Sequence, residues 1–183
     1  MRICITGYRP SKLPNTYGYD LNNTGYKKLS QAIIDVLFVI AMFNHNKDFT
    51  LISGMALGVD QLYVKTAIKL KQLWAKNFNI KITAAIPCRG QELKWPMQSR
   101  ELYHELLKEC NFVKYVHNGL YTPSCMDERN HWMVDNSDVV IAVWDGKSGG
   151  TANCIRYAKQ KHKNIYYINP NNYSVRRELN DKK

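Results

Sequence analysis

With 183 residues, 45% of them hydrophobic, the chain is large enough to bury a core and is expected to fold as one globular domain. Its longest apolar run, residues 36–43, is too short to cross a bilayer, which argues against a membrane protein. The formal net charge of +11 favours an anionic partner. The lysines and arginines are spread along the chain and form no compact stripe with interleaved aromatic residues. A nucleotide is therefore a better candidate for the partner, and nucleic-acid binding is considered unlikely.

The five cysteines are odd in number and have no closely paired spacing. This pattern favours reduced thiols in a cytoplasm and argues against a zinc site. Met1 and Arg2 lead directly into a strand-like run, without a secretory signal pattern. We therefore expect a cytoplasmic protein.

Apolar runs and helical periodicity alternate along the chain. Strands are predicted near residues 2–6, 49–53, 80–86, 112–116, 138–143 and 164–168. Helices are predicted near residues 24–44, 57–76, 91–109, 126–135 and 149–161. Such alternation predicts an α/β fold in which a parallel sheet carries helices on both faces. Residues 1–168 are expected to form the domain, and residues 169–183 a polar C-terminal tail.

Three predicted strands end in turns that contain glycine. These turns are residues 7–10 (GYRP), 53–58 (SGMALG) and 144–151 (WDGKSGGT). The carboxyl ends of parallel strands share one edge of a sheet, and ligands bind in the crevice there. Glycine lets the backbone approach a ligand, and the first amides of a helix bind anions. A phosphate-bearing ligand is therefore the first hypothesis, with turn geometry alone as the alternative reason for the glycines. The turn-rich loop at residues 11–23 is a candidate to lie over this edge.

Single side chains at these turns each have a functional and a structural interpretation. Arg9 is a candidate to bind a phosphate or to form a structural ion pair. Asp60 falls in the first turn of a predicted helix, where it either caps amides or binds a ribose hydroxyl. Gln91 and Glu92 begin another predicted helix, so a helix-start role for Glu92 is the alternative to ligand contact.

Two tryptophans are candidates for stacking on a base, a contact that contributes about 1–3 kcal/mol. Trp144 has the better position, directly after a strand, and Trp95 is the second candidate. Trp132 and Met133 are expected to pack in the core. Cys88 has no identified base beside it, so no nucleophilic role is assigned to it.

Six motifs follow one another along the chain. They are Gly7–Pro10 with Lys12 and Leu13, residues 53–60 (SGMALGVD), residues 86–92 (IPCRGQE) with Trp95, Asn130, residues 132–135 (WMVD) and residues 142–153 (AVWDGKSGGTAN). Together they resemble the YpsA-like branch of the SLOG superfamily over residues 1–168. The resemblance implies a Rossmann-like, doubly wound, mainly parallel sheet with helices on both faces that binds a nucleotide-derived ligand. One difference is Tyr8, where the family usually has His.

A second difference concerns catalysis. The Lonely Guy enzymes of this superfamily cleave a base from a nucleoside monophosphate, using a Gly-Gly-x-Gly-Thr turn followed by acidic residues. This chain matches only Gly149–Thr151, and Ala152 and Asn153 follow. Because an amide cannot hold a proton as general catalysis requires, we expect binding without turnover and assign no catalytic residue, metal or cofactor. The alternative is an enzyme on nucleoside phosphates, an N-glycosidase or a phosphodiesterase, with a carboxylate from Asp60, Glu92 or Asp145.

The resemblance also suggests the class of ligand. Sensor domains of bacterial defence systems in the superfamily recognise cyclic ADP-ribose-type molecules. We therefore expect a second messenger, either of that type or a cyclic nucleotide, to be sensed or sequestered, in a setting such as phage defence. Single-stranded DNA binding, by analogy with the DNA-processing protein A relatives, is weaker because their basic groove has no recognised counterpart here.

Resemblance and turns together define a predicted site. The phosphate is expected on the amides of residues 148–151, with Arg9 supplying charge. A second phosphate or ribose is expected against Gly54 and Met55, and the base against Trp144 or Tyr8. The predicted ligand-binding residues are Gly7, Tyr8, Arg9, Ser53, Gly54, Met55, Asp60, Pro87, Gln91, Glu92, Trp95, Trp144, Asp145, Gly146, Ser148, Gly149, Gly150, Thr151 and Asn153.

Assembly is the last expectation from the sequence. Relatives in the superfamily commonly form dimers or larger oligomers. The apolar residues in the predicted helix at 32–43 exceed one amphipathic face. A homodimer or higher homo-oligomer is therefore expected.

Overall fold

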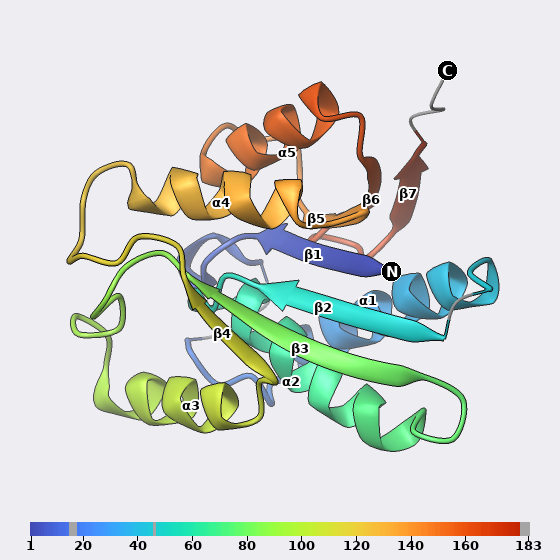
Figure 1. Cartoon of the computed structure of the whole chain (residues 1–183), viewed down its shortest axis with the longest axis horizontal. Helices are drawn as coiled ribbons and strands as arrows, with labels where there is room; N and C mark the ends of the chain where they lie inside the picture. Colours follow the sequence, from blue (N-terminus) through green and yellow to red (C-terminus); the bar gives the residue numbers. More distant parts are fainter. Residues whose placement is uncertain (15–17, 46, 180–183) are drawn as a thin grey trace.

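The computed structural model describes residues 1–14, 18–45 and 47–179 of the chain. One seven-stranded sheet lies between two layers of helices (Figure 1). The strands are β1 (Arg2–Gly7), β2 (Asp48–Ser53), β3 (Asn79–Ile86), β4 (Phe112–Tyr115), β5 (Val139–Val143), β6 (Asn164–Ile168) and β7 (Val175–Glu178). The helices are α1 (Thr24–Met42), α2 (Val59–Leu73), α3 (Met97–Lys108), α4 (Cys125–Asp135) and α5 (Gly150–Gln160), with a short 3₁₀ helix η1 (Pro10–Lys12).

The strand order β4-β3-β2-β1-β5-β6-β7 places β1 at the point where the direction of winding reverses. Strand β1 pairs in parallel with β2 on one side, where Arg2 lies opposite Thr50, and with β5 on the other, where Ile5 lies opposite Ile141. The first six strands are parallel, and only β7 is antiparallel to its neighbour. The Rossmann-like, mainly parallel sheet expected from the sequence is thus confirmed. In such sheets, the crevice at the reversal point is the usual place for a ligand.

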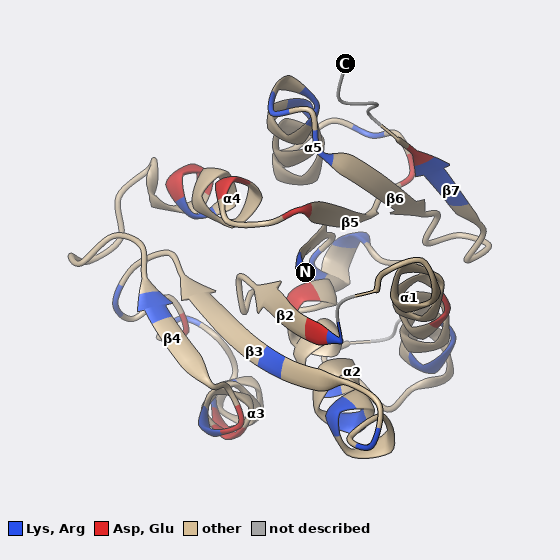
Figure 2. Cartoon of the chain, turned by 45° about the vertical axis from the view of Figure 1, so that its right-hand side comes forward, with Lys and Arg blue, Asp and Glu red and all other residues tan. Residues whose placement is uncertain are grey.

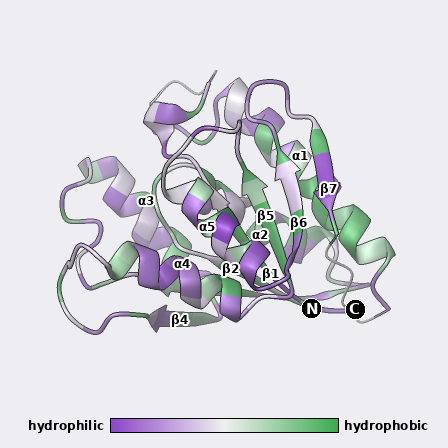
Figure 3. Ribbon diagram, turned by 90° about the horizontal axis from the view of Figure 1, so that it is seen from above, coloured by the Kyte–Doolittle hydropathy of each residue, from purple (hydrophilic) through white to green (hydrophobic). Residues whose placement is uncertain are grey.

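Alternate residues of each central strand face opposite helix layers. In β1, Ile3 and Ile5 belong to the apolar cluster beneath α1, α2 and α3, whereas Cys4 belongs to the cluster beneath α4 and α5. The same alternation in β5 separates Ile141 from Val140. Figure 3 shows the resulting contrast between the hydrophobic β5 and the largely hydrophilic α4. Burial on both faces explains why these strands are continuous apolar runs in the sequence.

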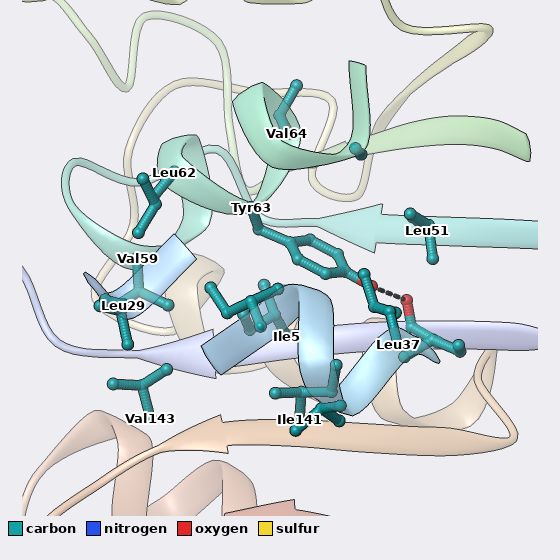
Figure 4. Close-up of a cluster of buried hydrophobic side chains, with 14 of the residues drawn as sticks. Ile5, Leu29, Leu37, Leu51, Val59, Leu62, Tyr63, Val64, Ile141 and Val143 are labelled. Atoms are coloured by element: carbon teal, nitrogen blue, oxygen red, sulfur yellow. Dashed lines mark hydrogen bonds between the residues drawn. The ribbon is translucent and has the colours of Figure 1, made fainter. Parts of the chain in front are cut away.

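Tyr63 places a polar atom in the larger cluster without leaving it unpaired. The side chain is fully buried between β1 and α1, beside Ile5 and Leu37 (Figure 4). Its hydroxyl donates a hydrogen bond of 3.2 Å to the Ile3 carbonyl oxygen. The bond fixes α2 against the central strand, because an unpaired buried hydroxyl would be costly. None of the helices among the described residues is long and apolar enough to cross a membrane.

The third helix is shorter than the sequence predicts. A helix was expected over residues 91–109, but α3 begins at Met97, and Pro96 occupies the position before it. Residues 90–94 form turns instead, in which the Leu93 amide donates to the Gly90 carbonyl oxygen. A residue that precedes proline avoids the helical conformation, so the helix cannot extend back through Trp95. The prediction that Gln91 and Glu92 begin a helix is therefore wrong.

Strand β7 was not predicted. Residues 175–178 (VRRE) pair with β6 inside the segment that was expected to be a polar tail, whereas residues 180–183 of that segment lie outside the described residues. The four residues are mostly exposed, so the strand shows no apolar pattern. Glu178 fixes it by accepting a hydrogen bond from Tyr167 and pairing with Lys159 of α5.

Close packing at the end of β1 gives a first testable prediction. A Cβ at Gly7 would lie 2.6 Å from a methyl carbon of Val59, which is fully buried in α2. We expect Gly7→Ala to lower the free energy of unfolding by about 1–3 kcal/mol, the usual cost of overpacking. In the Gly7→Ala/Val59→Gly double variant all three clashing atoms, the Cβ and both methyl carbons of Val59, are removed, so the two losses should not add. Denaturant unfolding of the four proteins measures this coupling, and additive losses would contradict the proposed contact.

Candidate functional site

A pocket of about 230 Å³ lies past the carboxyl end of β1, at the reversal point of the sheet. Four segments meet there: the end of β1 with the turn after it, the start of α5, the start of α2 and one face of α4. We call it the central pocket. Its lining comprises Ile5, Thr6, Gly7, Tyr8, Arg9, Ser11, Lys12, Ala56, Asp60, Met126, Arg129, Asn130, Gly149, Gly150 and Thr151.

The first turn of α5 forms one wall of this pocket. Gly149 precedes the helix with φ 139° and ψ −167°, a conformation that is essentially restricted to glycine. The amides of the first helical residues have no acceptor within the helix, and no acidic side chain occupies the first turn. Lys12 adds a positive charge, because its ammonium lies 3.7 Å from the point that a Cβ on Gly149 would occupy. This wall therefore favours an anion.

A buried ion pair forms the floor of the pocket. Nη1 of Arg129 lies 3.0 Å from Oδ2 of Asp60, and both side chains are more than nine-tenths buried. The Ala56 amide also donates to Oδ2, at 3.3 Å. A Cβ on Gly54 would lie only 1.2 Å from Nη1, so the guanidinium occupies space that any larger residue at position 54 would fill.

One hydrogen-bond donor of Arg129 is unsatisfied. Its Nε is buried and has no hydrogen-bond partner among the residues that the structure describes. Burial raises the pKa of Asp60, and the neighbouring Arg129 charge offsets part of that shift. An unsatisfied donor on a buried cation is costly, which makes the pocket receptive to an anionic acceptor.

Two larger hollows lie beside the central pocket and share lining residues with it, and we call the three together the cleft. The first, of about 670 Å³, shares Tyr8, Ser11 and Lys12 with the central pocket and continues over residues that follow β5 and β6. We call it the polar arm; its other lining residues are Leu13, Pro14, Asp145, Lys147, Ser148 and Asn171. Of the loop expected to cover this edge, residues 11–14 line the cleft and residues 15–17 lie outside the described residues.

The second hollow, of about 730 Å³, shares Arg9, Ser11 and Met126 with the central pocket. We call it the aromatic arm. It continues over the turn after β3, and its other lining residues are Pro10, Tyr19, Leu57, Arg89, Gly90, Gln91, Leu93, Lys94, Trp95, Leu120 and Tyr121. The Trp95 ring packs edge-on against Tyr103, with 5.5 Å between ring centroids.

Tyr8 and Asp145 are joined by a hydrogen bond between the ends of β1 and β5. The Tyr8 hydroxyl donates to Oδ1 of Asp145, whose Oδ2 lies 2.8 Å from the Lys147 ammonium. Hydrogen bonds from Lys147 and Tyr8 lower the pKa of Asp145 to about 2. Burial, followed by the Asp145 hydrogen bond, raises the pKa of Tyr8 to about 12. At neutral pH, Asp145 is therefore ionised and Tyr8 is protonated.

Most of the predicted site residues border the cleft. The central pocket includes Gly7, Tyr8, Arg9, Asp60, Gly149, Gly150 and Thr151; the polar arm includes Asp145 and Ser148; the aromatic arm includes Gln91 and Trp95. Others lie outside these linings, namely Ser53, Gly54, Met55, Pro87, Glu92, Trp144, Gly146 and Asn153. Ser53 lies beneath the pocket, where its hydroxyl donates to the Asp60 carbonyl oxygen. Asn153 accepts a hydrogen bond from Arg156 within α5.

Trp144 does not occupy the position expected of it. It lines a separate hollow with Gly146 and Tyr167, and its indole N–H donates to the Lys147 carbonyl oxygen. Between the two tryptophans, only Trp95 borders the cleft. The order of preference between them is therefore reversed.

Sequence reasoning missed Arg129, Met126 and Ser11 as residues of the pocket lining. Arg129 is 69 residues from Asp60 in sequence and reaches it only because α4 returns over the edge of β1. Its neighbour Asn130 and the nearby Lys12 had been noted in the motifs, but not as site residues. The one available signal was the carboxylate of Asp60 after a glycine turn, which requires a cation once it is buried.

A family model described as the YspA SLOG family matches residues 3–173. The SPbeta prophage-derived protein YoqJ of Bacillus subtilis is 28% identical over 153 residues, covering 78% of this chain and 86% of that protein. A UPF0398 protein of Halalkalibacterium halodurans is 27% identical, with coverage of 90% and 84%, and the UPF0398 protein YpsA of Bacillus subtilis is 25% identical, with 91% of each chain covered.

Among solved structures, DNA processing protein A from Helicobacter pylori, described by its single-stranded DNA binding mode, is similar in fold. The TM-score is 0.57 at 21% identity. The alignment covers 92% of this chain, which spans 65% of that protein's chain.

Removing one partner of the buried ion pair gives a second prediction. We expect Arg129→Met to lower the free energy of unfolding by about 3–5 kcal/mol at pH 7, because Asp60 is left as an unpaired buried charge. Without Arg129 the pKa of Asp60 rises further in the folded state, and a raised folded pKa means that stability falls as pH rises. The loss measured by denaturant unfolding should therefore be larger at pH 8 than at pH 5.

The Asp60→Asn/Arg129→Met double variant is the control for this experiment. It removes both charges, so it should be more stable than Arg129→Met alone at pH 8. The Arg129→Met variant could instead lose the same free energy of unfolding at both pH values, with no recovery when Asp60→Asn is added. That result would show that the pair carries no buried charge.

Proposed function

Because this chain belongs to the YspA SLOG family, we propose that its cleft binds a nucleotide-derived small molecule and does not turn it over. The observation that carries the proposal is the central pocket, where the start of α5 faces a buried guanidinium with an unsatisfied donor. A phosphate placed there would accept hydrogen bonds from the helix amides and from Arg129. Arg9 and Lys12, both on the lining, would supply further positive charge.

The carboxylates near the cleft are poorly placed for proton transfer. Asp60 is paired with Arg129, and Asp145 is held ionised by Tyr8 and Lys147. A general acid or base needs a pKa near the working pH, and the pKa of Asp145 is about 2. Glu92 lies outside the cleft linings, 4.0 Å from His104. These arrangements favour a binding protein over an N-glycosidase or phosphodiesterase.

We propose that the ligand is a signalling nucleotide. It is either of the ADP-ribose type, cyclic or in its open form, or a cyclic nucleotide, and its binding serves sensing or sequestration. The relative YoqJ is a prophage-derived protein, and capture of a host defence signal is one use that a prophage has for such a binder. The competing partner is single-stranded DNA, because the description of the structural neighbour names single-stranded DNA binding. Among the described residues, the lysine and arginine positions are spread over helices and strands on several sides of the chain (Figure 2).

A charge placed at the start of α5 tests the phosphate position. Gly150 has open space around the point where a Cβ would project, so Gly150→Asp and the isosteric Gly150→Asn should both fold. A carboxylate in the first turn stabilises a helix by about 0.3–1 kcal/mol, yet it repels a phosphate. We expect calorimetry with ADP-ribose and cyclic ADP-ribose to show about a 10- to 100-fold weaker affinity for Gly150→Asp than for Gly150→Asn, from the loss of a charged hydrogen bond.

Equal affinities of the Asp and Asn variants would remove the start of α5 from the site. A single-stranded oligonucleotide is the comparison ligand in the same titration. If it binds more tightly than every nucleotide, the proposal fails in favour of DNA binding.

Recovery of the ligand tests the absence of turnover. The protein is loaded with each nucleotide, denatured by heat, and its released small molecules are measured by mass spectrometry. We expect the mass of the added compound. Product in excess of one equivalent of protein would assign the chain to the enzyme alternative.

We also propose that a second copy covers the exposed apolar ends of α1 and α2. Phe43, Met42 and Leu73 are exposed by 78%, 67% and 65%, and Phe38 packs edge-on against Trp74 between the two helices. The run at residues 36–43 carries no charge, so a self-complementary contact there would bury none. Light scattering at micromolar concentration should give a dimer mass for the wild type and a monomer mass for Phe43→Glu. Phe112→Glu, which changes an exposed residue on β4, is the control and should remain a dimer. A wild-type monomer would contradict this.

A further inference from the structure

The cleft has two chemically different arms, which meet each other and the central pocket at Ser11 and extend in different directions along the sheet edge. The aromatic arm is built on the turn after β3, and the polar arm on the turns after β5 and β6. In the sheet order, β3 and β6 are separated by four strand spacings. At about 4.8 Å per spacing, the far ends of the two arms are anchored on the order of 20 Å apart. A nucleoside monophosphate with its phosphate in the central pocket reaches only one of them.

The aromatic arm has the chemistry of a nucleobase site. Trp95 is half-buried and held by its edge contact with Tyr103, while Tyr19 and Tyr121 are exposed on the same lining. Both polar atoms of the Gln91 carboxamide are buried and make no hydrogen bond with the described residues. Burial raises the pKa of Tyr103, and the Gln91 amide close to its hydroxyl offsets part of that shift, but the geometry falls short of a hydrogen bond. A carboxamide offers a donor and an acceptor together, which is the pattern that a base edge presents.

The polar arm has the chemistry of a sugar site. Its lining offers the Asp145 carboxylate, the Ser148 hydroxyl, the Asn171 amide and the Lys147 ammonium, and Tyr8 is the single aromatic residue among the described residues of this lining. An ionised carboxylate is an acceptor only, so Asp145 suits a ligand that presents hydroxyl donors. At about 670 Å³, this arm is similar in size to the aromatic arm, and both are larger than the central pocket between them.

We infer that the ligand is an extended nucleoside diphosphate sugar, with its base in the aromatic arm, its pyrophosphate in the central pocket and its second sugar in the polar arm. The inference rests on the proposed function and narrows it. The pyrophosphate lies between the α5 amides and Arg129, and the two ends of the molecule point away from each other along the sheet edge. Ring closure between base and second sugar would draw these ends together, so the open form binds better than the cyclic one.

Calorimetry on the wild-type protein compares matched pairs of probes: AMP with ADP-ribose, UMP with UDP-glucose and GMP with GDP-mannose, with cyclic ADP-ribose and ribose 5-phosphate added to the adenine series. In the series that binds, we expect the diphosphate sugar to bind at least tenfold more tightly than the monophosphate. If adenine is the preferred base, ADP-ribose should also exceed cyclic ADP-ribose and ribose 5-phosphate at least tenfold.

One variant in each arm makes the assignment specific. Asn171→Ala, at an exposed turn, should lower the affinity for the diphosphate sugar at least fivefold and leave the affinity for the monophosphate within twofold of the wild type. Trp95→Ala should lower the affinities for the monophosphate and the diphosphate sugar by similar factors, because both ligands carry the base. Since Trp95 is half-buried, Tyr121→Ala, exposed by 65%, is the second base-arm variant, and circular dichroism checks that each variant folds.

The outcomes separate the two proposals. A monophosphate that binds as tightly as its diphosphate sugar, or an Asn171→Ala loss that is equal for both, overturns the two-arm inference and leaves nucleotide binding intact. Absence of binding in all three series overturns the proposed function and the inference together. Tighter binding of cyclic ADP-ribose than of ADP-ribose overturns the extended geometry alone.

Discussion

The ion pair between Asp60 and Arg129 connects helices that cover opposite faces of the sheet. Asp60 belongs to α2 and Arg129 to α4, and they meet beyond the carboxyl ends of the central strands. Because both side chains are more than nine-tenths buried, neither charge is stable there without the other. The residues around the pair fit it: Gly54 leaves space for the guanidinium, and Ser53 donates to the backbone of Asp60. The shape and the charge of the central pocket both depend on this contact.

The strands and the shared edge could be predicted because they depend on local pattern. Ile3 to Ile5 and Val139 to Val143 are apolar on both faces, and a glycine turn follows each strand, so the edge of the crevice was visible in the sequence. The cation of the site could not be found in the same way. Arg129 lies in a helix whose other residues are evenly divided between polar and apolar, and only the return of α4 over β1 gives that one arginine a buried partner. Long-range pairing of this kind leaves no periodic trace in the chain.

The direction of individual side chains was equally hidden. Trp144 follows a strand as a base platform would, yet its indole N–H donates to the Lys147 carbonyl oxygen and it lines a hollow other than the three of the cleft. Trp95 reaches the cleft because Pro96 delays the start of α3 and leaves the preceding residues in turns. The edge strand β7 escaped prediction because its own residues are mostly exposed and show no apolar pattern, and a hydrogen bond from Tyr167 to Glu178 helps to hold it. In each case a single contact outweighed the pattern of the segment.

The bond between Tyr8 and Asp145 makes the crevice between β1 and β5 insensitive to acidity over a wide range. With pKa values of about 12 and about 2, neither group changes its protonation around neutrality, and no histidine is present on the described linings of the three compartments. Apart from Asp60, whose pKa is raised by burial and which is paired with Arg129, any change in affinity near pH 6 would then originate in the ligand. A terminal phosphate gains its second charge there, whereas a pyrophosphate esterified at both ends does not. The protonation of the bound molecule, rather than that of the protein, would reveal which kind of phosphate the crevice holds.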